Sequence, residues 1–182
     1  MRKVIHAPLI KEEIENLRAG DSVLLSGTIY TGRDAAHKRL CALLDAGDSL
    51  QLDICNQVIY YAGPCPAKPG DAIGSCGPTT SYRMDAYAPQ LCDLGLIGMI
   101  GKGPRSQSVI DAIQRNCGVY FAATGGAGAL IATCVKSAEV IAFEDLGTEA
   151  IRKLSVENLP LIVAIDAFGG NLYEEGPACY KK

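Results

Sequence analysis

The sequence predicts an α/β fold with a largely parallel central sheet, helices on one side and a smaller second sheet. Apolar runs of strand length end repeatedly in glycine-rich turns, and a helical pattern follows each turn. Strands that alternate with helices in this way are typical of parallel sheets. The chain has 182 residues, of which 48% are hydrophobic and 20% charged, as in globular proteins. We therefore expect residues 1–182 to form a single domain.

Four strand–turn–helix units are expected in the first three-quarters of the chain. The predicted strands cover residues 23–30, 72–76, 96–100 and 119–123. The helices that follow them are predicted at 34–46, 79–94, 106–116 and 128–137. Asp34, directly after Gly32-Arg33, has the side chain of a helix N-cap.

The rest of the chain continues the alternation. We expect a strand at 140–143, a helix at 148–154, a strand at 161–166 and a turn at 168–171. Two further strands, at 3–9 and 57–62, are expected in the second layer of the fold.

Charge and hydropathy argue against several classes of protein. The net charge is −3 and no block of five or six basic residues occurs, so nucleic acid and anionic membranes are not expected partners. Residues 116–135 carry no charge over a length that could cross a bilayer. Gly125, Gly126 and Gly128 interrupt this segment, which favours a buried strand, a turn and a helix. The N-terminus has no apolar signal segment, so we expect a cytoplasmic location.

The eight cysteines form no C-x-x-C pair, and the closest two, Cys55 and Cys65, are ten residues apart. This spacing disfavours a zinc or iron–sulfur site built from this chain alone. Reduced thiols are expected in a chain without a secretion signal. Cys65 and Cys76 are predicted in loops, whereas four others resemble small core residues: Cys41, Cys92, Cys117 and Cys134.

Three cations lie in or just after the predicted turns: Arg33, Arg83 and Lys102. In a parallel sheet these turns share one edge, where helix N-termini also point and where open α/β sheets bind ligands. Thr79 and Arg83, four apart at a predicted helix start, are expected on one helical face. The pattern indicates a site for carboxylate or phosphate. Other interpretations remain open. Arg33 and Arg83 are also compatible with surface or structural arginines, and Thr79 with a helix cap. Asp34 either caps its helix or orients Arg33.

Two further features have competing interpretations. His37, one turn into a helix, is either a proton carrier or a structural helix residue. The glycines at 125–128, followed by Glu144 and Asp145 as candidates to bind a ribose hydroxyl, resemble a dinucleotide-binding site. The G-x-G-x-x-G fingerprint fails, because Ile131 stands where its last glycine belongs. A nicotinamide cofactor is therefore not expected.

Six segments together resemble one family, the iron–sulfur-dependent hydro-lyases that comprise class I fumarate hydratase and L(+)-tartrate dehydratase. The resemblance is to the beta subunit, or the C-terminal domain of single-chain enzymes, and covers the chain in order except for the final GPACYKK. The segments are SGTIYTGRDAAHKR (26–39), YYAGPCPAKPG (60–70), IGSCGPTTSYRMD (73–85), IGKGP (100–104), FAATGGAGAL (121–130) and AFEDLGTEAI (142–151).

The resemblance implies a swivelling β/β/α domain that pairs with an alpha subunit, in a higher oligomer of alpha–beta pairs. In this family the alpha subunit holds a [4Fe–4S] cluster with three cysteines, so no metal ligand is expected here. By position, Arg33, Arg83 and Lys102 match the residues that bind the substrate carboxylates, and Thr79 matches the proposed catalytic base.

The implied reaction is the reversible hydration of fumarate to (S)-malate, catalysed only together with the alpha subunit. Two alternatives remain open at this point. One is the dehydration of L(+)-tartrate by the same kind of subunit, and the other is a stand-alone carboxylate-binding regulatory module.

Overall fold

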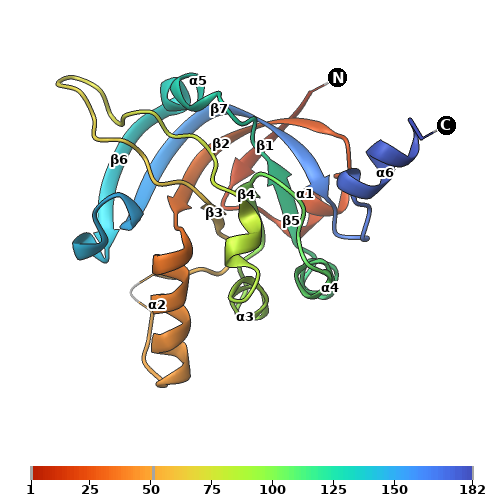
Figure 1. Cartoon of the computed structure of the whole chain (residues 1–182), viewed down its shortest axis with the longest axis horizontal. Helices are drawn as coiled ribbons and strands as arrows, with labels where there is room; N and C mark the ends of the chain where they lie inside the picture. The colour runs from red at the N-terminus through yellow and green to blue at the C-terminus, as the bar shows by residue number, and fades with distance from the viewer. Residues whose placement is uncertain (1, 51, 182) are drawn as a thin grey trace.

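The computed structural model describes residues 2–50 and 52–181, whose strands form one seven-stranded sheet (Figure 1). The strands are β1 (Lys3–Ala7), β2 (Ser22–Thr31), β3 (Val58–Tyr60), β4 (Gly98–Gly101), β5 (Val119–Ala122), β6 (Val135–Ala142) and β7 (Ile151–Ile165). The α/β class predicted from the sequence is confirmed.

The sheet curls into a closed ring. Its order is β1-β2-β3-β4-β5-β7-β6, and β7 also pairs with β2, so that β2, β3, β4, β5 and β7 enclose a barrel-like core. Neighbours from β1 to β5 run parallel, whereas β7 is antiparallel to β2, β5 and β6. The predicted second sheet is wrong for the described residues, because β1 and β3 belong to the same sheet as the others. Periodicity within a strand does not show which strands pair.

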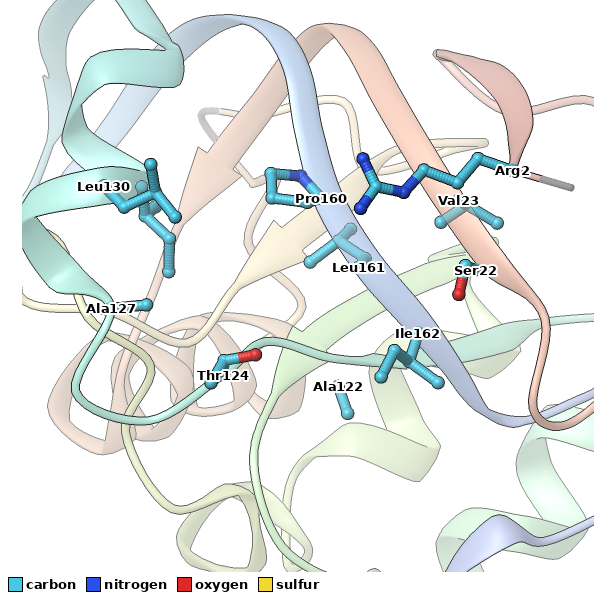
Figure 2. Close-up of a pocket in the computed structure, with 11 residues that line it drawn as sticks. Arg2, Ser22, Val23, Ala122, Thr124, Ala127, Leu130, Pro160, Leu161 and Ile162 are labelled. Atoms are coloured by element: carbon cyan, nitrogen blue, oxygen red, sulfur yellow. The ribbon is translucent and has the colours of Figure 1, made fainter.

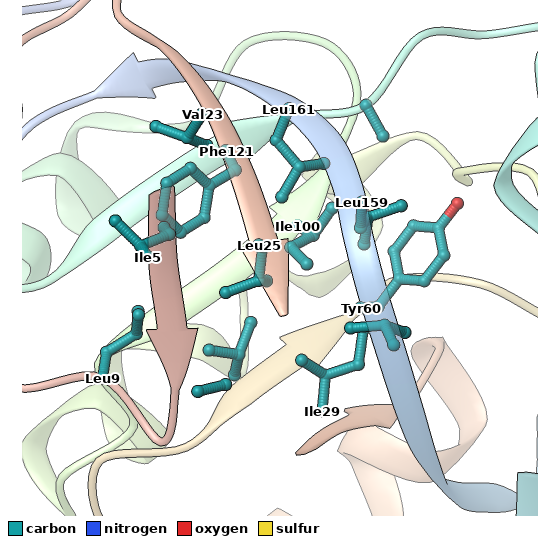
Figure 3. Close-up of a cluster of buried hydrophobic side chains, with 14 of the residues drawn as sticks. Ile5, Leu9, Val23, Leu25, Ile29, Tyr60, Ile100, Phe121, Leu159 and Leu161 are labelled. Carbon is teal, nitrogen blue, oxygen red and sulfur yellow. The ribbon is translucent and has the colours of Figure 1, made fainter. Parts of the chain in front are cut away.

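Alternating side chains divide the apolar residues between two clusters. On β4, Ile100 points into the ring while Met99 points outward, and on β5 the same holds for Phe121 and Tyr120. The inner cluster fills the barrel (Figure 3). The outer cluster lies between the strands and three helices. Close packing on both faces of β3, β4 and β5 therefore fixes the position of their carboxyl ends.

The α-helices are α1 (Lys11–Glu15), α2 (Asp34–Asp45), α3 (Ala88–Asp93), α4 (Gln107–Arg115), α5 (Gly128–Cys134) and α6 (Leu172–Ala178). Two 3₁₀ segments are η1 (Ser81–Met84) and η2 (Glu144–Glu149). Helices α2, α3 and α4 lie together on one side of the strands, and α5 lies on the opposite side (Figure 1). The prediction of helices on one side therefore holds for only part of the set.

Two predicted elements before β4 are wrong. Residues 72–76 form no strand, and the helix expected at 79–94 is replaced by η1, a turn and the short helix α3. Pro89 stands in the first turn of α3, where its missing N–H costs no hydrogen bond, so the helix starts late.

Two further predictions fail after β5. The helix expected at 128–137 ends at Cys134, and β6 begins at Val135. The helix expected at 148–154 is instead the end of η2 and the start of β7. Ile151 and Leu154 are buried and three residues apart. This spacing is typical of a helix, although both residues belong to strand β7.

The uncharged segment 116–135 contains β5, a glycine turn and α5, as predicted. Among the described residues, none of the helices has the length and apolar character needed to span a bilayer.

Candidate functional site at the carboxyl edge of the sheet

The carboxyl ends of β2, β3, β4 and β5 meet at one edge, because these strands are parallel neighbours. Arg33 follows β2, Gly63 follows β3, Lys102 follows β4 and Gly125 follows β5. The prediction of a shared edge is confirmed for the turns after β2, β4 and β5. The predicted turn at 77–78 follows no strand, and the turn after β3 takes its place.

The segment around Thr79 returns across this edge. The backbone N–H of Thr79 donates to the carbonyl of Tyr61 at 2.7 Å, and that of Ser81 donates to the carbonyl of Lys102 at 2.9 Å. Thr80 forms a parallel bridge with Lys102. Thr79 is therefore a neighbour of the β3 and β4 ends. The predicted helical face that Thr79 and Arg83 would share does not exist, since Thr79 precedes η1.

Arg83 and Lys102 are free to bind an anion. Within residues 2–50 and 52–181, neither cation makes an ion pair or donates a side-chain hydrogen bond. The Lys102 side chain lies beside the glycine turn after β5, because a Cβ added to Gly125 would be 3.9 Å from its Nζ. Arg83 is exposed on η1, which starts directly after the Thr79–Thr80 pair.

Arg33, by contrast, has two carboxylate neighbours. Its Nη2 lies 3.3 Å from Glu149 Oε1 and 3.5 Å from Asp34 Oδ1, while its Nε is buried and has no partner in the described chain. Arg33 itself occupies the N-cap position of α2, so the predicted Asp34 cap is wrong. Glu149 Oε2 instead accepts the N–H of Ala35 at 3.2 Å. Asp34 and Glu149 thus hold the guanidinium from one end.

A buried ion pair lies beneath the edge. Arg105 Nε donates to Asp85 Oδ1 at 2.7 Å, and the two side chains are 0% and 12% exposed. Asp85 Oδ2 also accepts the N–H of Ser106 at 2.6 Å. The guanidinium lies 5.3 Å from the ring centroid of Tyr61 and 5.0 Å from that of Tyr120. The pair ties the turn after Arg83 to the turn after Lys102.

His37 is fully buried next to this layer. Its Nδ1 lies 2.9 Å from the carbonyl oxygen of Arg33, which can only accept, so Nδ1 carries the proton. The ring packs edge-on against Tyr61 at a centroid distance of 5.2 Å. Burial lowers the pKa of His37 to about 4, so the ring is neutral at pH 7. This geometry favours the structural interpretation over the proton carrier.

The cysteines do not form a ligand set. Among the residues that the structure describes, no group of three or more His, Cys, Asp or Glu side chains is placed to hold a metal ion. Cys76 lies in the inner core and Cys92 in the outer core. Burial raises the pKa of Cys76 to about 12 and that of Cys92 to about 11, which disfavours the thiolate that a metal requires. An iron–sulfur cluster therefore does not fit these residues.

Three cavities lie elsewhere on the molecule. The one in Figure 2 measures about 200 Å³ and is lined mostly by apolar residues, with Arg2 at one end and Leu130 at the other. The other two, of about 450 and 570 Å³, flank the loop around Cys65. None of the three is lined by Arg33, Thr79, Arg83 or Lys102. Arg33, Thr79 and Lys102 thus lie at the carboxyl edge, Arg83 lies on η1, which follows Thr79 and Thr80, and none of the four residues lines one of these cavities.

Sequence reasoning missed the residues that support the edge. Asp85 and Arg105 lie only two and three residues beyond the candidate cations, but their burial has no signature in the sequence. Glu149 is 114 residues from Ala35, so nothing local indicates that it reaches α2.

Comparison with known proteins identifies the family. A family model described as "Fumarase C-terminus" matches residues 2–176. The chain is 42% identical over 153 residues to the aerobic class I fumarate hydratase of Escherichia coli K12, an alignment that covers 83% of this chain but 28% of that enzyme. It is 34% identical over 181 residues to a Geobacillus stearothermophilus protein named "Putative fumarate hydratase class I", with coverages of 96% and 34%.

A second kind of relative has the same extent as this chain. The Methanocaldococcus jannaschii protein named "Putative L(+)-tartrate dehydratase subunit beta" is 38% identical over 173 residues, and the alignment covers 92% of this chain and 89% of that protein. The fumarate hydratases, by contrast, are matched over about a third of their length or less. The family match extends over nearly the whole chain and includes all four candidate residues, so this protein belongs to the fumarase C-terminus family.

Proposed function

We propose that residues 1–182 form one catalytic domain of a hydro-lyase that reversibly hydrates fumarate to (S)-malate together with a second subunit. Membership of the family supports the reaction class, and the E. coli relative bears the name of fumarate hydratase. The observation that carries the proposal is that the segment Thr79–Ser81 pairs with Tyr61 and Lys102 at the carboxyl edge of the sheet, where Lys102 makes no ion pair within the described chain.

The chain's own residues have separable roles in this reaction. Lys102, Arg83 and Arg33 bind the two carboxylates of the substrate. When a proton leaves the carbon next to a carboxylate, negative charge spreads into that carboxylate. A cation that faces this charge stabilises the transition state more than the ground state, which accelerates the reaction.

Thr79 is proposed to accept or relay that proton. A neutral hydroxyl is a weak base, so Thr79 requires a partner that takes the proton onward. In the described chain its backbone N–H is fixed by Tyr61, while no side-chain hydrogen bond of its hydroxyl is formed. The activating group is therefore proposed to come from the second subunit.

We also propose that the second subunit holds the [4Fe–4S] cluster and that this chain closes over it as a swivelling domain. The scattered cysteines and the open edge support this division of labour. A higher oligomer of alpha–beta pairs in the cytoplasm is the assembly we expect.

The test is anaerobic reconstitution with a cluster-bearing alpha subunit, followed by assays on fumarate, L(+)-tartrate and mesaconate. This chain should be colourless and inactive alone, and activity should appear only in the complex. Arg83→Lys should lower turnover at least about tenfold, because the planar fork is lost while the charge stays. Wild-type kinetics for that variant would remove Arg83 from the site. If the chain alone binds malate and copurifies without a partner, it is a regulatory module instead.

L(+)-tartrate dehydration is the second candidate. It is favoured by the relative named as a tartrate dehydratase beta subunit, which matches this chain over 89% of its own length. A higher kcat/KM for L(+)-tartrate than for malate in the reconstituted complex would select this substrate.

A further inference from the structure

The turn that carries Lys102 is held from both sides by tyrosine hydroxyls. The N–H of Gly103 donates to the hydroxyl oxygen of Tyr173 at 2.9 Å. The hydroxyl of Tyr120 donates to the carbonyl of the same glycine at 2.9 Å. Gly103 has a φ of +85°, a conformation that glycine adopts without steric cost. Both polar groups of this residue are thereby satisfied by side chains from outside the turn.

The two tyrosines come from different elements of the fold. Tyr120 lies on β5, is fully buried, and its hydroxyl is also 2.8 Å from that of Ser81. Tyr173 comes from α6, which lies at the far end of the chain and beyond the closed ring (Figure 1). Among the hydrogen bonds of residues 2–50 and 52–181, the one from Gly103 to Tyr173 is the one that links α6 to the Lys102 turn.

Tyr173 is placed by a rigid turn. The carboxylate of Asp166, only 3% exposed, accepts the N–H groups of Phe168 at 2.9 Å and Gly170 at 3.0 Å. Asn171 then caps α6, and its Oδ1 accepts the N–H of Tyr173 at 3.1 Å. A buried carboxylate that accepts several N–H groups is a strong local restraint. The hydroxyl of Tyr173 thus meets Gly103 in a preorganised position.

We propose that Tyr173 is a positioning residue of this site, whose hydroxyl fixes the Lys102–Gly103 turn and thereby the ammonium group of Lys102. The inference rests on the proposed function, in which Lys102 binds a substrate carboxylate. The peptide between Lys102 and Gly103 sets the direction in which the Lys102 side chain leaves the backbone. Loss of the Tyr173 contact leaves that peptide held only at its carbonyl, by the Ser81 N–H at 2.9 Å, and this weaker restraint lets the ammonium group shift from its place beside Gly125.

Tyr173→Phe tests the inference, because it deletes one oxygen and keeps the ring that packs on the outer cluster. Tyr180→Phe is the matched control, since Tyr180 is 87% exposed in the same C-terminal segment. In the reconstituted complex, Tyr173→Phe should raise KM for the dicarboxylate about three- to tenfold, the size expected for one hydrogen bond. We expect kcat to fall as well, because a displaced ammonium group stabilises the charge of the transition state less than the wild-type arrangement does.

Two readouts separate positioning from general stability. Hydrogen exchange of the Gly103 amide should accelerate in Tyr173→Phe but not in Tyr180→Phe, while the thermal midpoint falls by no more than the few degrees expected for one hydrogen bond. A lower midpoint together with an unchanged KM would show a merely structural role and overturn the inference. So would a KM and a Gly103 exchange rate equal to those of the control.

Lys102→Ala distinguishes failure of this inference from failure of the proposed function. If Lys102→Ala loses activity while Tyr173→Phe matches wild type, the positioning role is refuted and the proposed function stands. If Lys102→Ala has wild-type kinetics, Lys102 binds no substrate and both proposals fall.

Discussion

Asp85→Asn should destabilise this protein far more than any exposed charge substitution of the same kind. The carboxylate accepts from Arg105 Nε at 2.7 Å and from the Ser106 N–H at 2.6 Å, so both of its oxygens face donors. An asparagine of the same shape turns its NH₂ group toward one of these donors. Arg105 cannot lose its proton and has a side chain that is 0% exposed, so its charge stays buried without compensation.

The expected loss is about 3–5 kcal/mol, the usual cost of breaking a buried ion pair. For a chain of this size, each kcal/mol lowers the thermal midpoint by about 2–4 °C, so the shift should be roughly 6–20 °C. Thermal unfolding followed by circular dichroism at pH 7 measures it.

Asp93→Asn provides the control. Asp93 pairs with Arg115 through two contacts of 2.8 Å, but these side chains are 49% and 46% exposed. Water and salt screen such a pair, so its loss should change the midpoint very little. Equal midpoint shifts for Asp85→Asn and Asp93→Asn would refute the argument that burial makes the Asp85–Arg105 pair essential.

Substitutions at three other residues have definite expected outcomes. The folded state binds a proton on His37 only below about pH 4, whereas the unfolded chain does so below 6.5, so stability falls as the pH drops through this window. Urea unfolding should show a loss of about 2 kcal/mol between pH 6.5 and 5 that is absent in His37→Gln. Gly101→Ala should cost about 1–3 kcal/mol in thermal unfolding, because the added Cβ overlaps Ser81 Oγ and lies 2.9 Å from the Tyr61 ring. Thr79→Ser should keep part of the turnover and Thr79→Val almost none, as measured in the reconstituted complex; equal rates for Val and wild type would exclude Thr79 from proton transfer.

The sequence predicted the strands better than their arrangement. β2, β4 and β5 and the helices α2 and α4 lie within about three residues of their predicted bounds. The closed ring was not predictable, because it depends on β7 pairing with β2, more than a hundred residues away. The helix predicted at 148–154 was wrong for a local reason. Short apolar spacings such as that of Ile151 and Leu154 do not distinguish a twisted strand from a helix.

The candidate site was predictable where it depends on turns and unpredictable where it depends on burial. Arg33 and Lys102 follow parallel strands, so topology alone brings them to one edge. Thr79 reaches that edge for a different reason from the one predicted, since an irregular segment rather than a helix carries it back across the strands. Asp85 and Tyr173 act through contacts that no local pattern indicates.

The three cations that look equivalent in the sequence are not equivalent in the structure. Arg33 has two carboxylates within 3.5 Å, so the local charge around it is already negative. A substrate carboxylate that approaches this guanidinium must compete with both of them, and it cannot use the Nε–H, which is buried. Arg83 and Lys102 have no carboxylate partner in the described chain, so they attract an anion by charge. In the proposed site, substrate binding through Arg83 and Lys102 should therefore weaken as the ionic strength rises.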